Sequence, residues 1–161
     1  MTIKNWIEFF IDNNDLKYLG IDLARNNKEI SEEWIHAQLN RYKNQGFGHL
    51  AVIQKSTGYF IGMGGVPREL NEKNEYEIAY SLKPKYWGKG YATEIAKTMI
   101  EYGFSSKLSE RFISIIALEN LNSSKVAIKN GMKLEYNTDY LNMMVNVFSV
   151  TNKESTKFQM K

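Results

Sequence analysis

Hydrophobic residues recur with helical spacing near the start of the chain and with strand-like spacing further along. Residues 5–13 carry Trp6, Phe9 and Phe10 at intervals that fit one face of a short helix. From residue 49 the apolar positions form short runs rich in β-branched and aromatic residues, with turn residues such as KSTG between them. These runs predict strands over 49–54, 59–66 and 75–82.

Residues 31–46, SEEWIHAQLNRYKNQG, show a stronger helical pattern. Ser31 suits the N-cap because its hydroxyl can accept a hydrogen bond from a free N–H group of the first turn. The glutamates that follow it favour the positive end of the helix dipole, and Gly46 suits the C-terminal end. The apolar face predicted for this helix consists of Trp34, Ile35, Leu39 and Tyr42.

The second half of the chain alternates between the two kinds of spacing. Helical spacing over 91–106 and 122–131 flanks an apolar run at 111–118, and two further strand-like runs follow at 133–137 and 143–150. The predicted order is therefore two helices, three strands, helix, strand, helix and two strands. That order indicates a single mixed α/β domain over residues 1–161, with one strand–helix–strand crossover.

Composition narrows the classes of protein. The chain has 161 residues, a net charge of +3, no Cys and two His. The absence of Cys excludes disulfides and thiolate metal sites, and two His are too few for a His-rich metal site. No apolar run has the roughly 20 residues that cross a bilayer, and the mild charge without a basic stripe makes nucleic acid an improbable partner. We expect a cytoplasmic protein without a metal.

The string YWGKGYAT lies between a predicted strand and a predicted helix. Gly88 and Gly90 let the backbone turn so that N–H groups point inward, and a phosphate can approach without meeting a Cβ atom. The helix that follows adds free N–H groups and the positive end of its dipole. These features predict an anion site, although a tight turn alone would also need the two glycines.

Other phosphate motifs fit this string poorly. A P-loop requires GxxxxGK[ST], which the chain lacks. The dinucleotide fingerprint GxGxxG fails because Thr93 stands where the third glycine or an alanine belongs, and the string follows a meander of strands rather than opening the chain.

Two ordered motifs resemble the GNAT family of N-acetyltransferases, in particular its RimJ/RimL-like branch. WGKGYA resembles the family's acetyl-CoA signature Q/R-x-x-G-x-G/A, with Trp87 at the Q/R position, as is common in that branch. YEIAYSL resembles the branch's E-I-G-Y-x-L strand. ENLNSSKVAIKNGM resembles E-N-x-x-S-x-x-V-x-x-K-x-G-F, with matches at Glu119, Asn120, Ser123, Val126, Lys129 and Gly131.

The resemblance implies a GNAT fold of the α/β class, in which a mixed, mostly antiparallel central sheet is flanked by helices. Members of the branch usually begin with a strand before the first helix, and this sequence matches from the helix onward. The first strand is therefore expected to be missing, which would leave residues 49–54 at a sheet edge. Either a homodimer or the N-terminal helices would then cover that edge.

The resemblance also implies acetyl-CoA as cosubstrate and a set of residues that bind it. Backbone N–H groups of the glycine loop would hold the pyrophosphate, the Leu82 N–H would face the thioester oxygen, and Asn120 would contact the pantetheine, unless it only forms a turn or cap. Lys89 adds charge, or is simply a solvated loop lysine. The predicted cofactor-binding residues are Tyr80, Leu82, Trp87, Gly88, Lys89, Gly90, Tyr91, Ala92, Thr93 and Asn120.

Two residues are candidates for proton transfer. Glu77 lies on the strand next to the thioester and could accept a proton from the amine, directly or through water, or be a surface carboxylate. Many relatives in the wider family place a thiolate-side Tyr where this chain has Ala127. The RimJ/RimL-like branch implies Ser123 for that role, and helix capping is its alternative.

The implied reaction is transfer of the acetyl group to a primary amine by direct attack in a ternary complex. The acceptor is a protein N-terminal α-amine or a small-molecule amine. A non-catalytic acyl-CoA-binding sensor on the same fold is the alternative, because Ala127 and the missing first strand depart from the family. A third hypothesis, an RNA-surface binder, lacks interleaved basic and aromatic residues. The acidic residues Glu33, Glu135 and Asp139 are interpreted mainly as charged surface.

Overall fold

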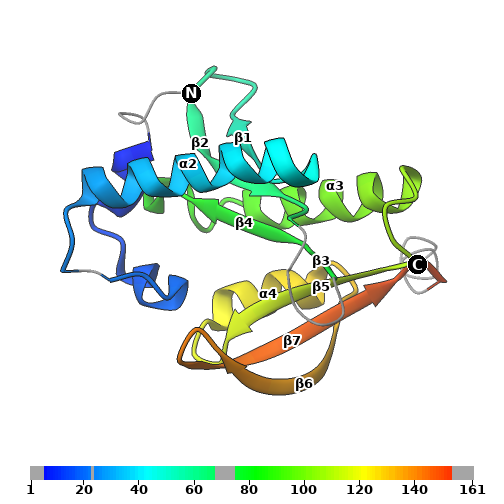
Figure 1. The fold of residues 1–161 in the computed structure, drawn as a ribbon. Coiled ribbons are helices and arrows are strands. Elements are labelled where there is room, and N and C mark those ends of the chain that lie inside the picture. The colour runs from blue at the N-terminus through cyan, green and yellow to red at the C-terminus, as the bar shows by residue number, and fades with distance from the viewer. Residues whose placement is uncertain (1–5, 23, 68–74, 154–161) are drawn as a thin grey trace.

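The computed structural model describes residues 6–22, 24–67 and 75–153, which build two sheets that meet along one shared segment (Figure 1). In the first sheet, with order β1-β2-β4, all neighbours are antiparallel. In the second, with order β3-β5-β7-β6, only β3 and β5 are parallel. The strands are β1 (His49–Ile53), β2 (Phe60–Gly65), β3 (Tyr76–Glu77), β4 (Ala79–Leu82), β5 (Arg111–Ala117), β6 (Lys133–Tyr140) and β7 (Met143–Thr151).

The segment predicted as one strand over 75–82 divides between the two sheets. Its first half, β3, pairs with β5, and the Ile78 N–H donates to the Ile113 carbonyl. Its second half, β4, pairs with β2, and the Lys83 N–H donates to the Ile61 carbonyl. The chain therefore leaves β5 at Ile78, and β4 and β5 are not paired beyond this point.

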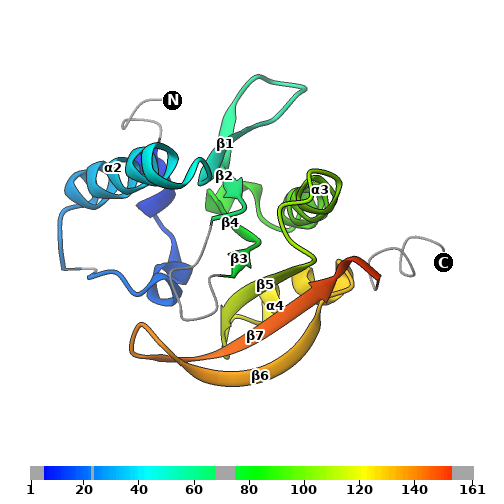
Figure 2. The ribbon, with the colours of Figure 1, turned by 45° about the vertical axis from the view of Figure 1, so that its right-hand side comes forward.

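Helices cover both faces of the first sheet. Figure 2 shows α2 (Asn27–Gln45) on one side of β1, β2 and β4, and α3 (Tyr91–Ser105) on the other. The short helix α4 (Leu121–Lys129) packs against β5 and α3. Three 3-10 turns complete the described helices: η1 (Glu8–Phe10), η2 (Asn14–Leu19) and η3 (Pro84–Tyr86). The sequence pattern had predicted neither η2 nor η3.

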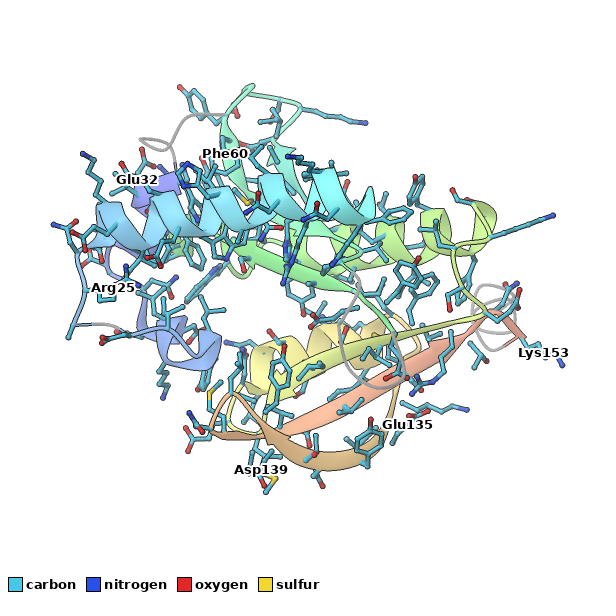
Figure 3. The ribbon with its side chains drawn as sticks, in the orientation of Figure 1. Arg25, Glu32, Phe60, Glu135, Asp139 and Lys153 are labelled. Carbon is cyan, nitrogen blue, oxygen red and sulfur yellow. The ribbon has the colours of Figure 1, made fainter. Side chains whose placement is uncertain are left out.

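An aromatic cluster holds the N-terminal helices on the first sheet. Trp6 stacks on Phe9 with ring centroids 4.4 Å apart, and both pack with Phe60 and Met63 of β2. Figure 3 labels Phe60 beside the N-terminal half of α2. The predicted helical face of residues 5–13 is therefore buried against the face of the sheet.

The predicted start of α2 was wrong. The helix begins at Asn27, and the Asn26 side chain accepts from the Lys28 N–H as the N-cap. Ser31 lies one turn inside, where its Oγ donates to the Asn27 carbonyl. Part of the predicted apolar face was also wrong, because Leu39 is 59% exposed. Gly46 ends the helix in the left-handed region, as predicted.

The predicted fold class is confirmed, with β1 as an edge strand of the described sheet. At the start of this edge α2 provides cover, because the His49 N–H donates to Gln38 Oε1 and the His49 carbonyl accepts from the Tyr42 hydroxyl. Further along, Leu50 and Ile53 are about half exposed, at 53% and 50%. The helices therefore cover only the beginning of the edge, and a homodimer stays a prediction. Within the described residues, no helix is long and apolar enough to span a membrane.

Candidate functional site

A cavity of about 580 Å³ lies where β4 leaves β5. It extends from the loop before α3 to the underside of η1 and α2. All but one of the predicted site residues line it: Glu77, Tyr80, Leu82, Trp87, Gly88, Gly90, Tyr91, Ala92, Thr93, Asn120 and Ser123. The exception is Lys89, whose exposed side chain has its Nζ 5.5 Å from the centroid of the Tyr86 ring.

The glycine loop has the geometry of an anion site. Gly88 and Gly90 have φ angles of +71° and +85°, in the left-handed region that favours glycine. A Cβ atom built on either glycine would meet nothing within 4 Å, so the space beside the loop is open to a ligand. The first bond inside α3 runs from the Glu94 N–H to the Gly90 carbonyl, which leaves the N–H groups of residues 91–93 without intrahelical acceptors.

The end of β4 presents a backbone donor to the cavity. Strand hydrogen bonds alternate between the two edges, and the Lys83 N–H is bonded to β2. The Leu82 N–H therefore points the other way, toward the gap that β5 no longer fills. The Leu82 carbonyl accepts from Trp87 Nε1 at 2.7 Å, which ties the glycine loop to the strand end.

Where β4 leaves β5, backbone groups near Ile78 and Ile115 lose their strand partners. Side chains form hydrogen bonds with these groups instead. Ser114 Oγ donates to the Ile78 carbonyl at 2.8 Å, and the Ile115 N–H lies 3.4 Å from Glu77 Oε1. Glu77 is half-buried and lines the cavity. It is therefore not the fully solvated surface carboxylate of the alternative interpretation.

The start of α4 forms the wall opposite β4. Asn120 is its N-cap, with Oδ1 accepting from the Ser123 N–H at 3.1 Å. Capping thus belongs to Asn120 rather than to Ser123, and Ser123 lines the cavity. The Tyr80 hydroxyl lies 3.4 Å from the Ser123 carbonyl, and burial raises the pKa of Tyr80 to about 12. Ala127, on the same helix, is buried.

A buried lysine connects the end of β4 to η1. The Lys83 side chain is 6% exposed, and its Nζ lies 3.0 Å from Glu8 Oε2 in η1. Hydrogen bonds from Lys83 and Lys85 lower the pKa of the Glu8 carboxyl. This ion pair fixes η1 beside the residue that follows Leu82.

Several residues that the sequence analysis did not assign to a site also line the cavity. Lys125 and Lys129, one turn apart on α4, line the cavity. Beneath η1 and α2 the cavity is lined by Phe9, Asn13, Trp34, Arg41 and His49. The available signal was the spacing of Trp34, Gln38 and Arg41, which places polar side chains on the inward face of α2.

The three acidic residues interpreted as surface do not line the cavity. Glu33 pairs with Arg25, and that hydrogen bond lowers the pKa of the Glu33 carboxyl. Figure 3 shows Glu135 and Asp139 along β6, and Glu135 accepts hydrogen bonds from Arg111 and Ser149. Among the described residues, no group of His, Cys, Asp or Glu is placed to hold a metal ion.

Comparison with known proteins places this geometry in a family. The family description "Acetyltransferase (GNAT) domain" matches residues 4–133. The chain belongs to the GNAT acetyltransferase family. This confirms the family predicted from the sequence motifs.

Two relatives from Bacillus subtilis (strain 168) show the extent of the likeness. YnaD, an uncharacterized N-acetyltransferase, is 31% identical over 135 residues, which cover 82% of this chain and 75% of YnaD. YkkB, an uncharacterized protein, is 32% identical over 106 residues, which cover 65% of this chain and 62% of YkkB. The match thus spans less than two thirds of the length of YkkB.

A solved structure of RimL, the ribosomal L7/L12 alpha-N-protein acetyltransferase, in complex with coenzyme A has the same fold. The TM-score is 0.74 at 15% identity, covering 92% of this chain and 88% of RimL. The predicted likeness to the RimJ/RimL-like branch therefore holds at the level of the fold.

Proposed function

We propose that this protein transfers the acetyl group of acetyl-CoA to a primary amine, which attacks the thioester directly while both substrates are bound. One observation carries the proposal: a single cavity joins an open helix N-terminus, a free strand-end donor and the Glu77 carboxylate. An anion-binding end and a proton-accepting group in the same cavity are what a two-substrate acyl transfer requires.

The residues present fit acetyl-CoA. The open space beside Gly88 and Gly90 and the N–H groups of residues 91–93 suit a pyrophosphate. Lys125 and Lys129 add positive charge to the lining of the same cavity. When bound, acetyl-CoA supplies an acyl group already activated as a thioester.

Leu82 is the proposed oxyanion donor, because its N–H points into the gap between β4 and β5. A backbone donor needs no reorganisation during the reaction, and one such donor typically contributes about 2.7–4 kcal/mol in acyl transfer. Trp87 holds the Leu82 carbonyl from the loop side and thereby fixes the direction of the peptide group.

Glu77 is the proposed base and Ser123 the proposed donor to the departing thiolate. A lysine-type amine has a pKa of about 10.4 and arrives protonated at neutral pH, whereas an α-amine at about 8 loses its proton more readily. Glu77 lines the cavity on the strand that carries the oxyanion donor, and Ser123 lies on the facing helix. The proposal extends to both acceptor classes, a protein N-terminal α-amine and a small-molecule amine.

Release of free thiol from acetyl-CoA tests the proposal. The acceptors are N-terminal peptides, polyamines, aminoglycosides and amino acids, and calorimetry measures acetyl-CoA affinity in parallel. Thiol release that depends on an amine, with the acetylated product found by mass spectrometry, supports the enzyme. Binding of acetyl-CoA without turnover of any amine would support the acyl-CoA sensor, which the buried Ala127 favours.

A further inference from the structure

Four residues at the acceptor end of the cavity have no part in acetyl transfer as proposed above. Trp34, Gln38 and Arg41 lie on one face of α2, and His49 begins β1 directly beneath them. The rings of Trp34 and His49 have centroids 5.2 Å apart. Trp34, Arg41 and His49 all line the cavity. Gln38 and Arg41 point inward from this helix face, and buried polar groups require polar partners. The residues gathered here therefore define a candidate subsite.

Hydrogen bonding fixes the tautomer of His49. The His49 backbone N–H lies 3.1 Å from Gln38 Oε1, and an N–H group can only donate, so the amide atom facing it is the oxygen. The same oxygen lies 3.0 Å from His49 Nδ1, which must therefore carry the proton. Burial, with the nearby Arg41 charge, lowers the pKa of His49 to about 4. At neutral pH the ring is uncharged, and Nε2 is a hydrogen-bond acceptor.

Arg41 lacks a counter-ion among the described residues. Within residues 6–22, 24–67 and 75–153 its guanidinium makes no ion pair within 4.0 Å, although Arg25 and Arg111 both have carboxylate partners there. Arg41 is half-buried and lines the cavity, and its charge acts on His49. A partly desolvated guanidinium without a partner is suited to a planar oxyanion from a ligand.

The strand register gives the distance between His49 and the strand that carries the proposed oxyanion donor. His49 pairs with Gly65, and Gly65 pairs with Ala79, so the three residues form one row across the sheet. Two strand spacings separate His49 from Ala79, which is about 10 Å between backbones. The side chains of one such row lie on the same face. Ala79 lines the cavity, as does Glu77 two residues before it.

We propose that Arg41 and His49 form a subsite for an amine acceptor that carries a carboxylate at some distance from the reacting nitrogen. Arg41 pairs with the carboxylate, and His49 Nε2 accepts a hydrogen bond from an N–H of the same molecule. The acceptor class is an ω-amino acid or a short peptide with a free C-terminus. This inference rests on the proposed acetyl transfer.

One guanidinium favours a carboxylate over a phosphate. The groups proposed to bind phosphate are those of the glycine loop and the start of α3, and α3 lies on the opposite side of the first sheet from α2 (Figure 2). Arg41 has no second cation beside it among the cavity-lining residues of α2 and β1. A single fork of donors matches the single charge and two oxygens of a carboxylate.

A ladder of ω-amino acids tests the subsite. Glycine, β-alanine, γ-aminobutyrate, 5-aminovalerate, 6-aminohexanoate and glycylglycine are each compared with the carboxamide of the same length, by thiol release from acetyl-CoA. We expect kcat/KM to favour the carboxylate by at least tenfold for a member longer than glycine. Arg41→Met should bring that ratio close to one, and Arg41→Lys should restore part of it. Lys43→Met removes the same charge from an exposed position two residues along α2 and should keep the wild-type ratio.

A second readout does not depend on turnover. Calorimetry measures binding of the N-acetylated ω-amino acids to the protein saturated with coenzyme A, and Arg41→Met should weaken it about tenfold. Carboxamides that react as well as carboxylates, an Arg41→Met variant that keeps the preference, or equal product binding by both proteins would each overturn the subsite. If acetyl-CoA fails to bind, or no amine of the wider panel is acetylated, the proposed function fails instead.

Discussion

The two ends of the cavity are lined by different kinds of chemical group. The cofactor end consists mainly of backbone: the N–H groups of residues 91–93, the Leu82 N–H and two glycines with positive φ. The acceptor end consists of side chains that η1, α2 and β1 contribute separately. A backbone site serves any ligand with the same phosphate, whereas a side-chain site can change its specificity one residue at a time.

This difference decides what each end contributes to the reaction. Backbone donors at the cofactor end are fixed by the fold and need few particular side chains. Glu77, the proposed base, lies at the division of the strand and lines the cavity. The predictions below probe Glu77 and then each end in turn.

The largest expected effect is at Glu77. Glu77→Gln should lower kcat on the order of 10²-fold, because a carboxamide cannot accept the amine proton. Acetyl-CoA affinity should be kept, since Gln can still accept from the Ile115 N–H through its oxygen. The pH–rate profile should lose its acidic limb, on which the carboxylate of the wild type becomes protonated. Glu32→Gln on the outer face of α2 serves as control, and a wild-type rate and profile in Glu77→Gln would remove Glu77 from the mechanism.

The next largest effect is expected in the free energy of unfolding, which should depend on pH through His49 at the acceptor end. The folded protein keeps His49 neutral down to a pKa of about 4, whereas the unfolded chain takes up the proton near 6.5. Stability should therefore be constant above about pH 6.5 and fall as the pH drops from there toward 4. Between pH 7 and pH 5 this amounts to about 2 kcal/mol for the single group. Urea unfolding at both pH values should show this loss in the wild type and a smaller loss in His49→Gln; equal losses would contradict the assignment.

At the glycine loop, the effect of a substitution on acetyl-CoA binding can be separated from its effect on backbone strain. Gly90 and Gly58 have similar φ angles, +85° and +72°, and a Cβ atom at either would meet nothing within 4 Å. Alanine should therefore cost a similar amount of stability at either position, because the positive φ strains its backbone in both. Only Gly90 lines the cavity, so Gly90→Ala should weaken acetyl-CoA binding at least tenfold, about 1.4 kcal/mol. Calorimetry on both variants decides, and equal affinities would show that the loop does not bind the cofactor.

The contrast between the two ends also explains what the sequence could predict. Gly88 and Gly90 were identifiable because a turn with positive φ restricts the residue type. Arg41 and His49 carry no such restriction, and they meet only because α2 crosses the start of β1. The start of α2 was misplaced for a related reason: both Asn26 and Ser31 are good N-caps, and the choice depends on how the preceding residues pack.

The division of the strand at Ile78 was likewise invisible in the pattern of residues 75–82. Alternation of apolar residues indicates a strand without naming the partner of each half. The partners are set by long-range groups, Ile113 for the first half and Ile61 for the second. The family resemblance supplied the expectation of a splayed strand, which periodicity alone did not contain.

The smallest expected effect lies at the link between the glycine loop and the strand end. Trp87→Phe keeps an aromatic ring but removes the Nε1 donor to the Leu82 carbonyl. A neutral hydrogen bond contributes about 1 kcal/mol, so kcat/KM for acetyl-CoA should fall about fivefold. The loss should appear equally with every amine, because Trp87 fixes the Leu82 peptide group and does not reach the acceptor subsite. A loss that varies with the carboxylate of the amine would mean that the two ends are coupled, and that the backbone site depends on the acceptor after all.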